Sequence, residues 1–184
     1  MRIIDDLLPH NDSLSLRDVG EVAMVVLHCT ELPTLKDARD AALRKPGTGA
    51  SGPAEAHYYI DRDGSVSRFV NDDRVARHVA GHNEHSIGIE MVNLGRYPDW
   101  FASGQQVPTE EYPEGQILSL LDLLSELRHR LPSLRELRRH SDLDKRLVPA
   151  RDNPKTMVHR RIDPGPLFPW ERVLCAWTGH RGDG

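Results

Sequence analysis

The sequence predicts a single α/β domain in which helices flank a central mixed β-sheet. Apolar runs with strand character alternate with segments of helical periodicity, an order typical of α/β domains. Two strand-like segments are joined by a short turn, and such a hairpin adds antiparallel pairing. The 184 residues suit one domain with a substantial core. We therefore expect one domain over 1–184, with its core at about 20–178 and a disordered tail at 179–184.

The first predicted elements are a buried strand and a helix. Residues 22–27 form a continuous apolar run rich in β-branched side chains, which favours a strand covered on both faces. Thr34 followed by Asp37 resembles a capping box and predicts a helix over 35–45. A Gly-, Ser- and Pro-rich loop at 47–53 ends this helix.

A hairpin and a further strand follow. Segments 56–60 and 66–70 flank a turn that contains an Asp-Gly pair, which predicts a hairpin. Segment 86–92 is also strand-like. Its alternation places three apolar side chains on one face and two small side chains with one acid on the other: Ile87, Ile89 and Met91 against Ser86, Gly88 and Glu90. The acid beside a glycine makes Glu90 a candidate functional residue.

The second half of the chain contains two predicted helices. Residues 97–112 are interrupted by Pro and Gly and indicate an irregular segment. Segment 114–131 has the strongest helical pattern, with leucines at three- and four-residue spacing: Leu120, Leu123, Leu124, Leu127 and Leu131. A long polar loop is expected over 141–159. A last helix over 170–177 follows Pro169.

Bulk composition excludes several classes of function. The formal net charge of −4 and the 28% of charged residues give no electrostatic sign of a nucleic-acid binder. No stretch approaches the roughly 18 apolar residues that a membrane span requires. The first residues lack the basic and apolar pattern of a secretory signal. We therefore expect a cytoplasmic monomer, with a periplasmic or exported protein as the alternative.

The cysteines and histidines differ in what they suggest. Cys29 and Cys175 lie far apart and form neither a disulfide framework nor a metal motif, so we expect two reduced, mostly buried thiols. The chain also has 10 histidines, a number that points to site chemistry. Five of them we assign to the solvated surface: His82, His85, His129, His159 and His180.

His28, His140 and Asp163 are candidate metal ligands. Two imidazoles and a carboxylate with one open position suit a catalytic zinc ion. Their spacing in the sequence does not show that they converge, and for His28 alone a hydrogen-bonded structural role is the more common case. Cys29 follows His28 directly, and because adjacent strand residues face opposite ways, we do not expect it to share a metal with His28.

Six stretches occur in a specific order along the chain. They are 26–28 (Val-Leu-His), 56–66 (Ala-His-Tyr-Tyr-Ile-Asp-Arg-Asp-Gly-Ser-Val), 78–81 (His-Val-Ala-Gly), 83–90 (Asn-Glu-His-Ser-Ile-Gly-Ile-Glu), His140 and 161–170 (Arg-Ile-Asp-Pro-Gly-Pro-Leu-Phe-Pro-Trp). Each stretch is modest, but their number and order make the pattern specific. Together they resemble the N-acetylmuramoyl-L-alanine amidase family, which includes AmpD-type amidases, related phage lysozymes and peptidoglycan recognition proteins.

The resemblance implies an activity and a site. It implies one zinc ion held by His28, His140 and Asp163, with Glu90 as the catalytic acid–base residue. An aspartate as third ligand, and Ala56 where the phage lysozymes have a catalytic tyrosine, fit the AmpD type. The expected reaction is hydrolysis of the amide bond between N-acetylmuramic acid, or its 1,6-anhydro form, and L-alanine. The expected partners are peptidoglycan fragments and muropeptides.

Arg161 departs from the family pattern, which usually has lysine two positions before the aspartate ligand. A guanidinium group can stabilise an oxyanion, but its pKa above 12 prevents proton donation at neutral pH. The resemblance therefore implies an electrostatic role for Arg161. The loop between His140 and Asp163 is also longer than in the short cytosolic relatives.

Other side chains in these stretches have two open interpretations. His57, His78 and Asn83 occupy positions that line the substrate groove in relatives, and packing roles are equally open. Trp100 and Phe101 could form an aromatic wall for the sugar or pack inward.

Two alternative functions remain. The family includes non-catalytic recognition modules that have lost zinc ligands, but here all three ligand positions and Glu90 carry competent residues, which favours catalysis. An unrelated zinc hydrolase would leave the coincidence of several motifs unexplained. A role in muropeptide recycling, as a phage endolysin or as a secreted effector remains open.

Overall fold

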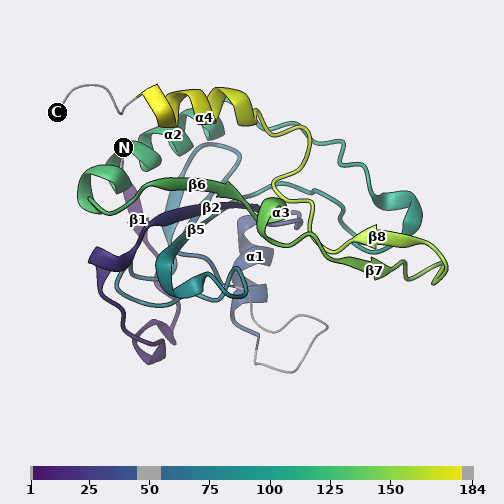
Figure 1. The fold of residues 1–184 in the computed structure, drawn as a ribbon, viewed down its shortest axis with the longest axis horizontal. Coiled ribbons are helices and arrows are strands. Elements are labelled where there is room, and N and C mark those ends of the chain that lie inside the picture. Colours follow the sequence, from purple (N-terminus) through teal and green to yellow (C-terminus); the bar gives the residue numbers. More distant parts are fainter. Residues whose placement is uncertain (1, 45–54, 180–184) are drawn as a thin grey trace.

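A mixed, six-stranded sheet lies at the centre of the protein (Figure 1). The computed structural model describes residues 2–44 and 55–179. The strand order is β1-β4-β3-β5-β2-β6. The strands are β1 (Ile3–Asp5), β4 (Val66–Arg68), β3 (Tyr58–Ile60), β5 (Ser86–Met91), β2 (Met24–Cys29) and β6 (Glu136–Arg139). Strands β3 and β4 pair antiparallel and the other neighbours pair parallel, so the predicted mixed sheet is confirmed.

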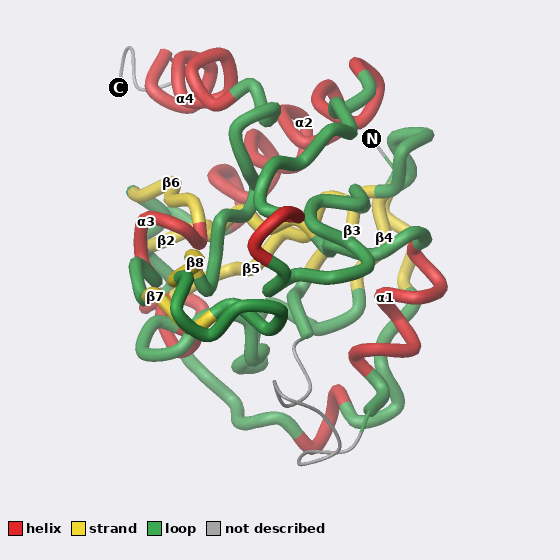
Figure 2. The backbone as a smooth tube through the Cα atoms, turned by 90° about the vertical axis from the view of Figure 1, so that its right-hand side faces the viewer, coloured by secondary structure: helices red, strands yellow, loops and turns green. Residues whose placement is uncertain are grey.

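Helices cover both faces of this sheet (Figure 2). Helices α2 (Glu114–Arg130) and α4 (Trp170–Gly179) lie together on one face, and α1 (Leu35–Ala42) lies on the other. The five predicted leucines of the α2 pattern are all buried in the core cluster on the α2 side. The α/β domain with flanking helices is therefore confirmed.

The two faces of β5 differ as the alternation predicts. Ile87, Ile89 and Met91 belong to the core cluster that α2 and α4 complete. Ser86, Gly88 and Glu90 point to the opposite face, since successive strand residues alternate. This second face carries the polar side chains described below.

The predicted helix α1 and the predicted hairpin are both present, but their helix and strands are shorter than predicted. The Thr34 side chain accepts a hydrogen bond from the backbone N–H of Asp37, and α1 ends at Ala42. The predicted end at residue 45 and the loop at 47–53 lie outside the described residues. In the β3–β4 turn, Gly64 has φ +85°, a left-handed conformation that glycine adopts without strain.

Several elements differ from the sequence prediction. Strand β2 starts at Met24 and extends through Cys29 because its pairing with β5 continues to Met91. Strands β1 and β6 were not predicted, since both are short edge strands with few buried side chains. Leu8, which precedes residue 20, is buried in a second cluster of apolar side chains. The segment expected as a loop at 141–159 contains part of α3 (His140–Leu143) and the hairpin β7 (Leu147–Pro149) and β8 (Met157–His159).

The cysteine prediction is half wrong. Cys29 is buried, but Cys175 is exposed on α4, because α4 buries only the face that packs on α2. Of the assigned surface histidines, His85, His129 and His159 are exposed, His82 is half-buried, and His180 lies outside the described residues. None of the described helices is long and apolar enough to cross a bilayer.

Candidate metal centre

The carboxyl ends of β2, β5 and β6 bring the candidate residues together. These strands are parallel, so their carboxyl ends meet at one edge of the sheet, where α/β proteins commonly bind ligands. His28 in β2 lies directly opposite Glu90 in β5. His140 follows the last residue of β6. Asp163 comes from the segment between β8 and α4, and its carbonyl accepts a hydrogen bond of 3.1 Å from the backbone N–H of Ser141.

One atom from each of His28, His140 and Asp163 forms a nearly equilateral triangle. Nδ1 of His28 lies 3.0 Å from Nδ1 of His140 and 3.1 Å from Oδ2 of Asp163, and the third edge is 2.9 Å. Each ring nitrogen can donate one proton in one direction, so hydrogen bonds cannot satisfy all three edges. A tetrahedral zinc ion at about 2.0–2.1 Å keeps its ligand atoms roughly 3.3 Å apart, close to the observed edges. The triangle therefore fits a zinc ion.

The charge state of this triangle also suits a metal. All three residues are buried, and burial lowers the pKa of His28 to about 4, so its imidazole is neutral at neutral pH. Burial alone would raise the pKa of Asp163, but the facing His140 and His28 outweigh it and hold this pKa well below its usual value. A neutral imidazole and an ionised carboxylate are the metal-binding forms.

Glu90 and Arg161 contribute two polar atoms without partners beside the triangle. Oε2 of Glu90 and Nε of Arg161 are buried and have no hydrogen-bond partner among the described residues. Burial and the negative charge of Asp163 raise the pKa of Glu90, while Arg161 opposes this rise. Buried unpaired polar atoms are rare in native proteins. A carboxylate and a guanidinium kept unpaired next to a metal site are suited to act on a bound molecule.

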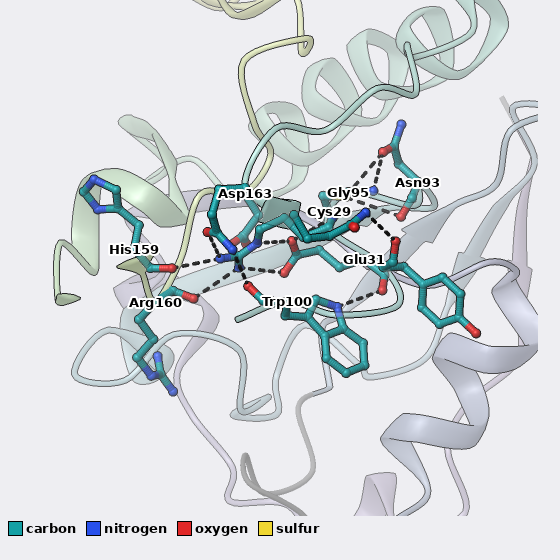
Figure 3. A network of polar contacts seen from close by, with 12 residues as sticks. Cys29, Glu31, Asn93, Gly95, Trp100, His159, Arg160 and Asp163 are labelled. Carbon is teal, nitrogen blue, oxygen red and sulfur yellow. Dashed lines mark hydrogen bonds and ion pairs between the residues drawn. The ribbon is translucent and has the colours of Figure 1, made fainter. Parts of the chain in front are cut away.

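A buried ion pair holds the segment that carries Arg161 and Asp163 (Figure 3). Nε of Arg96 donates to Glu31 at 2.7 Å and its Nη2 donates to the same carboxylate at 3.0 Å. Arg96 also donates to the backbone carbonyls of His159 and Arg160. This pair could not be predicted from the sequence, because no periodicity or motif marks a lone arginine as buried.

The aromatic segment after Arg96 adds to this network. Nε1 of Trp100 donates to the carbonyl of Glu31 at 3.1 Å, while 36% of Trp100 remains exposed. Trp100 therefore packs inward with its polar edge and keeps a solvent-facing surface, and Phe101 lies under the Arg96 guanidinium.

The three residues predicted at the substrate groove are engaged within the protein. His57 is completely buried, and its Nδ1 accepts a hydrogen bond of 3.0 Å from the backbone N–H of Gly88. Oδ1 of Asn83 accepts from the backbone N–H groups of His78 and Val79. His78 is buried and contacts His28. These contacts favour the packing interpretation for all three.

A pocket of about 420 Å³ adjoins the triangle through His140. Its wall includes Asp144, which pairs with Arg146 and Arg160, and the hydrogen bond from Arg146 lowers the pKa of this carboxyl. The pocket lies between the segment after His78 and the α3 region, and it is lined by Val79, Ala80, Gly81, His140, Leu143, Asp144, Lys145 and Arg146. It offers space for a ligand next to the candidate metal centre.

Comparisons with known proteins give a family match and several similar structures. Residues 18–166 match the family model described as N-acetylmuramoyl-L-alanine amidase. A search of curated proteins found no match. Among solved structures, the amidase LysC from Clostridium intestinale is 22% identical with a TM-score of 0.68, over 97% of this chain and 98% of that chain.

Two further structures contain bound cell-wall fragments. AmpDh3 from Pseudomonas aeruginosa, in complex with an anhydromuramic pentapeptide, is 26% identical with a TM-score of 0.63, over 85% of this chain and 60% of that chain. AmiD from E. coli, in complex with anhydro-N-acetylmuramic acid-L-Ala-D-γ-Glu-L-Lys, is 19% identical with a TM-score of 0.62, over 85% of this chain and 57% of that chain.

Proposed function

Because this chain belongs to the N-acetylmuramoyl-L-alanine amidase family, we propose that it is a zinc-dependent enzyme. It hydrolyses the amide bond between N-acetylmuramic acid, or its 1,6-anhydro form, and L-alanine of the peptidoglycan stem peptide. The observation that carries the proposal is the triangle of His28, His140 and Asp163, with edges of 2.9–3.1 Å. A recognition module has no need of three competent ligands beside an unpaired carboxylate.

The proposed mechanism assigns one task to each residue. His28, His140 and Asp163 would hold the zinc ion, which would supply a water of lowered pKa and polarise the scissile carbonyl. Glu90 accepts a proton from the attacking water and delivers it to the departing L-alanine nitrogen as the C–N bond breaks. The products are a muramoyl carboxylic acid and a free peptide amine.

Arg161 stabilises the negative charge that develops on the carbonyl oxygen. Its guanidinium keeps its charge throughout the reaction, and its Nε has no competing partner among the described residues. The usual lysine of the family could also donate a proton, so Arg161 leaves all proton transfer to Glu90.

The family and the ligands of the similar structures support this substrate class. AmpDh3 and AmiD were solved with anhydromuramoyl peptides, and in this chain a pocket of about 420 Å³ lies beside His140. A cytoplasmic enzyme meets recycled anhydro fragments, and an exported enzyme meets intact wall. Preference between the two glycan forms is therefore the readout for the biological role.

Product analysis by mass spectrometry tests the proposal directly. Purified protein is incubated with a defined N-acetylmuramoyl tripeptide and, separately, with its 1,6-anhydro form. The expected result is release of the free tripeptide, lost after chelation, restored by added zinc and abolished in Glu90→Ala. A protein that binds zinc and either ligand but releases no peptide would instead be a recognition module.

A further inference from the structure

The nitrogen of His28 that points away from the triangle meets a second buried histidine. Nε2 of His28 lies 3.0 Å from Nδ1 of His78, and the two rings are nearly perpendicular at 89°. Nε2 of His78 in turn lies 3.2 Å from Oγ of Ser86. The Ser86 hydroxyl donates to the backbone carbonyl of His82 at 2.7 Å. Four groups thus form one continuous chain that starts at a proposed zinc ligand.

The carbonyl at the end gives this chain a direction. A carbonyl can only accept, so the single hydroxyl proton of Ser86 points to His82. The Ser86 oxygen then accepts from Nε2–H of His78, which leaves Nδ1 of His78 unprotonated. That nitrogen accepts from Nε2–H of His28. The remaining nitrogen of His28, Nδ1, is therefore unprotonated, and its lone pair faces the triangle.

The opposite direction of hydrogen-bond donation is unfavourable at both ends of this chain. If the Ser86 hydroxyl turned to His78, the His82 carbonyl would lose its 2.7 Å hydrogen bond. His78 would then donate from Nδ1 to His28, and the proton of His28 would move to Nδ1. That proton would lie where His140 and Asp163 approach to 3.0 and 3.1 Å, and it would occupy the lone pair that a metal needs.

The strand β5 is shaped to hold His78 against His28. A Cβ atom at Gly88 would lie 2.6 Å from the His78 ring, a distance that real side chains do not tolerate, so only glycine leaves this space. Oδ1 of Asn83 holds the backbone of His78 by accepting a hydrogen bond of 3.1 Å from its N–H group. The place of His78 is thus set by both neighbours.

We propose that His78, Ser86 and the carbonyl of His82 form a relay that fixes His28 as its Nε2–H tautomer and so presents Nδ1 to zinc. His78 is a positioning residue in this scheme. The inference rests on the proposed zinc site. Partners of metal-ligating histidines typically contribute about 10–100-fold to metal affinity, and we expect an effect of this size.

Zinc affinity, measured by chelator competition, tests the relay without reference to catalysis. His78→Leu removes the acceptor for His28 and is expected to weaken zinc binding about 10–100-fold. His78→Gln can accept with its carbonyl and donate with its amide, so it should recover most of the loss. Ser86→Ala removes only the outer acceptor and should weaken binding less than His78→Leu. His129→Leu, the same change at an exposed position on α2, serves as the control, and thermal unfolding of each metal-free variant shows that it is folded.

The tautomers are read by ¹⁵N NMR of the imidazoles in the zinc-loaded protein. We expect Nε2–H on both His28 and His78. A proton on Nδ1 of His78, or unchanged zinc affinity in folded His78→Leu, would overturn the relay while leaving the metal site intact. Failure of the wild-type protein to bind zinc would instead refute the proposed function. The two outcomes are therefore separable.

Discussion

The two halves of the candidate site are held by different kinds of interaction. His28 and Glu90 sit on neighbouring central strands, where the register of β2 and β5 places them opposite each other. Arg161 and Asp163 sit on an irregular segment. Arg96, which pairs with Glu31, donates hydrogen bonds to the carbonyls of His159 and Arg160 directly before this segment. We call these the strand half and the loop half.

A single substitution should therefore affect the two halves differently. In the strand half, backbone hydrogen bonds between β2 and β5 hold the site residues in place. Because a side-chain substitution does not remove these bonds, the strand half should keep its structure when a functional side chain is changed. A buried ion pair is costly to break, because removal of one partner leaves the other charge buried and uncompensated. The loop half should therefore lose its geometry when one supporting residue is changed.

Glu90→Gln should give the largest effect and should act on chemistry alone. Loss of a general acid–base residue typically costs about 10²–10⁴-fold in rate, and the neutral amide cannot accept the proton of the attacking water. We expect kcat to fall by that factor, while the zinc content and the unfolding midpoint stay unchanged. Metal analysis and urea unfolding of the same samples check this. A variant that loses zinc as well would show that Glu90 supports the site structurally.

Arg96→Met should destabilise the protein through the loop half. It leaves the Glu31 carboxylate buried without its partner, at a cost of about 3–5 kcal/mol in the free energy of unfolding. Urea unfolding measures this cost. The double variant Arg96→Met with Glu31→Gln removes both charges and should recover part of the loss.

The exposed pair Arg172–Glu114 provides the control for this prediction. Arg172→Met breaks an ion pair whose members are solvent-exposed, and exposed pairs contribute little because water and salt screen them. We expect an unchanged unfolding midpoint. Equal effects of Arg96→Met and Arg172→Met would contradict the role given to the buried pair.

Arg161→Gln should slow the reaction without unfolding the protein. Removal of one oxyanion-stabilising donor typically costs about 10²–10³-fold in kcat. Arg161→Lys keeps the positive charge and restores the residue that is usual in the family, so it should retain most of the activity. Steady-state kinetics on the preferred muropeptide measures both variants. If Gln and Lys behaved alike, the charge at this position would have no electrostatic role.

The strand half could be predicted from the sequence and most of the loop half could not. Alternation in 86–92 places Glu90 on a polar face from local pattern alone, and the apolar run before His28 marks a central strand. That His140 and Asp163 lie close together was expected only from the family resemblance, because their spacing in the sequence does not predict a contact. Strand β6 has one buried side chain, Leu137, and therefore almost no periodic signal.

The supporting contacts of the site are the least predictable part. The Arg96–Glu31 pair joins residues 65 positions apart, and arginine is usually exposed. Glu31 has φ +51°, and the neighbouring residues in the sequence do not predict this backbone conformation. The contact between His28 and His78 likewise joins residues 50 positions apart, and no local pattern in the sequence indicates it. Such contacts depend on tertiary structure rather than on local pattern.

Zinc removal should lower the stability less than Arg96→Met does, and it should separate the two halves within one molecule. A ligand that binds only the folded state stabilises it by about 2.7 kcal/mol at 100 times its Kd, so chelation should lower the unfolding midpoint modestly. Hydrogen exchange should then quicken at the Ser141 amide, which donates to the carbonyl of Asp163, while the amides of β2 within the ladder keep their protection. Asp163→Ala removes one proposed zinc ligand. Chelation of that variant should therefore change hydrogen exchange neither at the Ser141 amide nor at the β2 amides. Equal loss of protection at β2 and at Ser141 would mean that the metal supports the sheet edge as much as the loop, and the division between a strand half and a loop half would have to be abandoned.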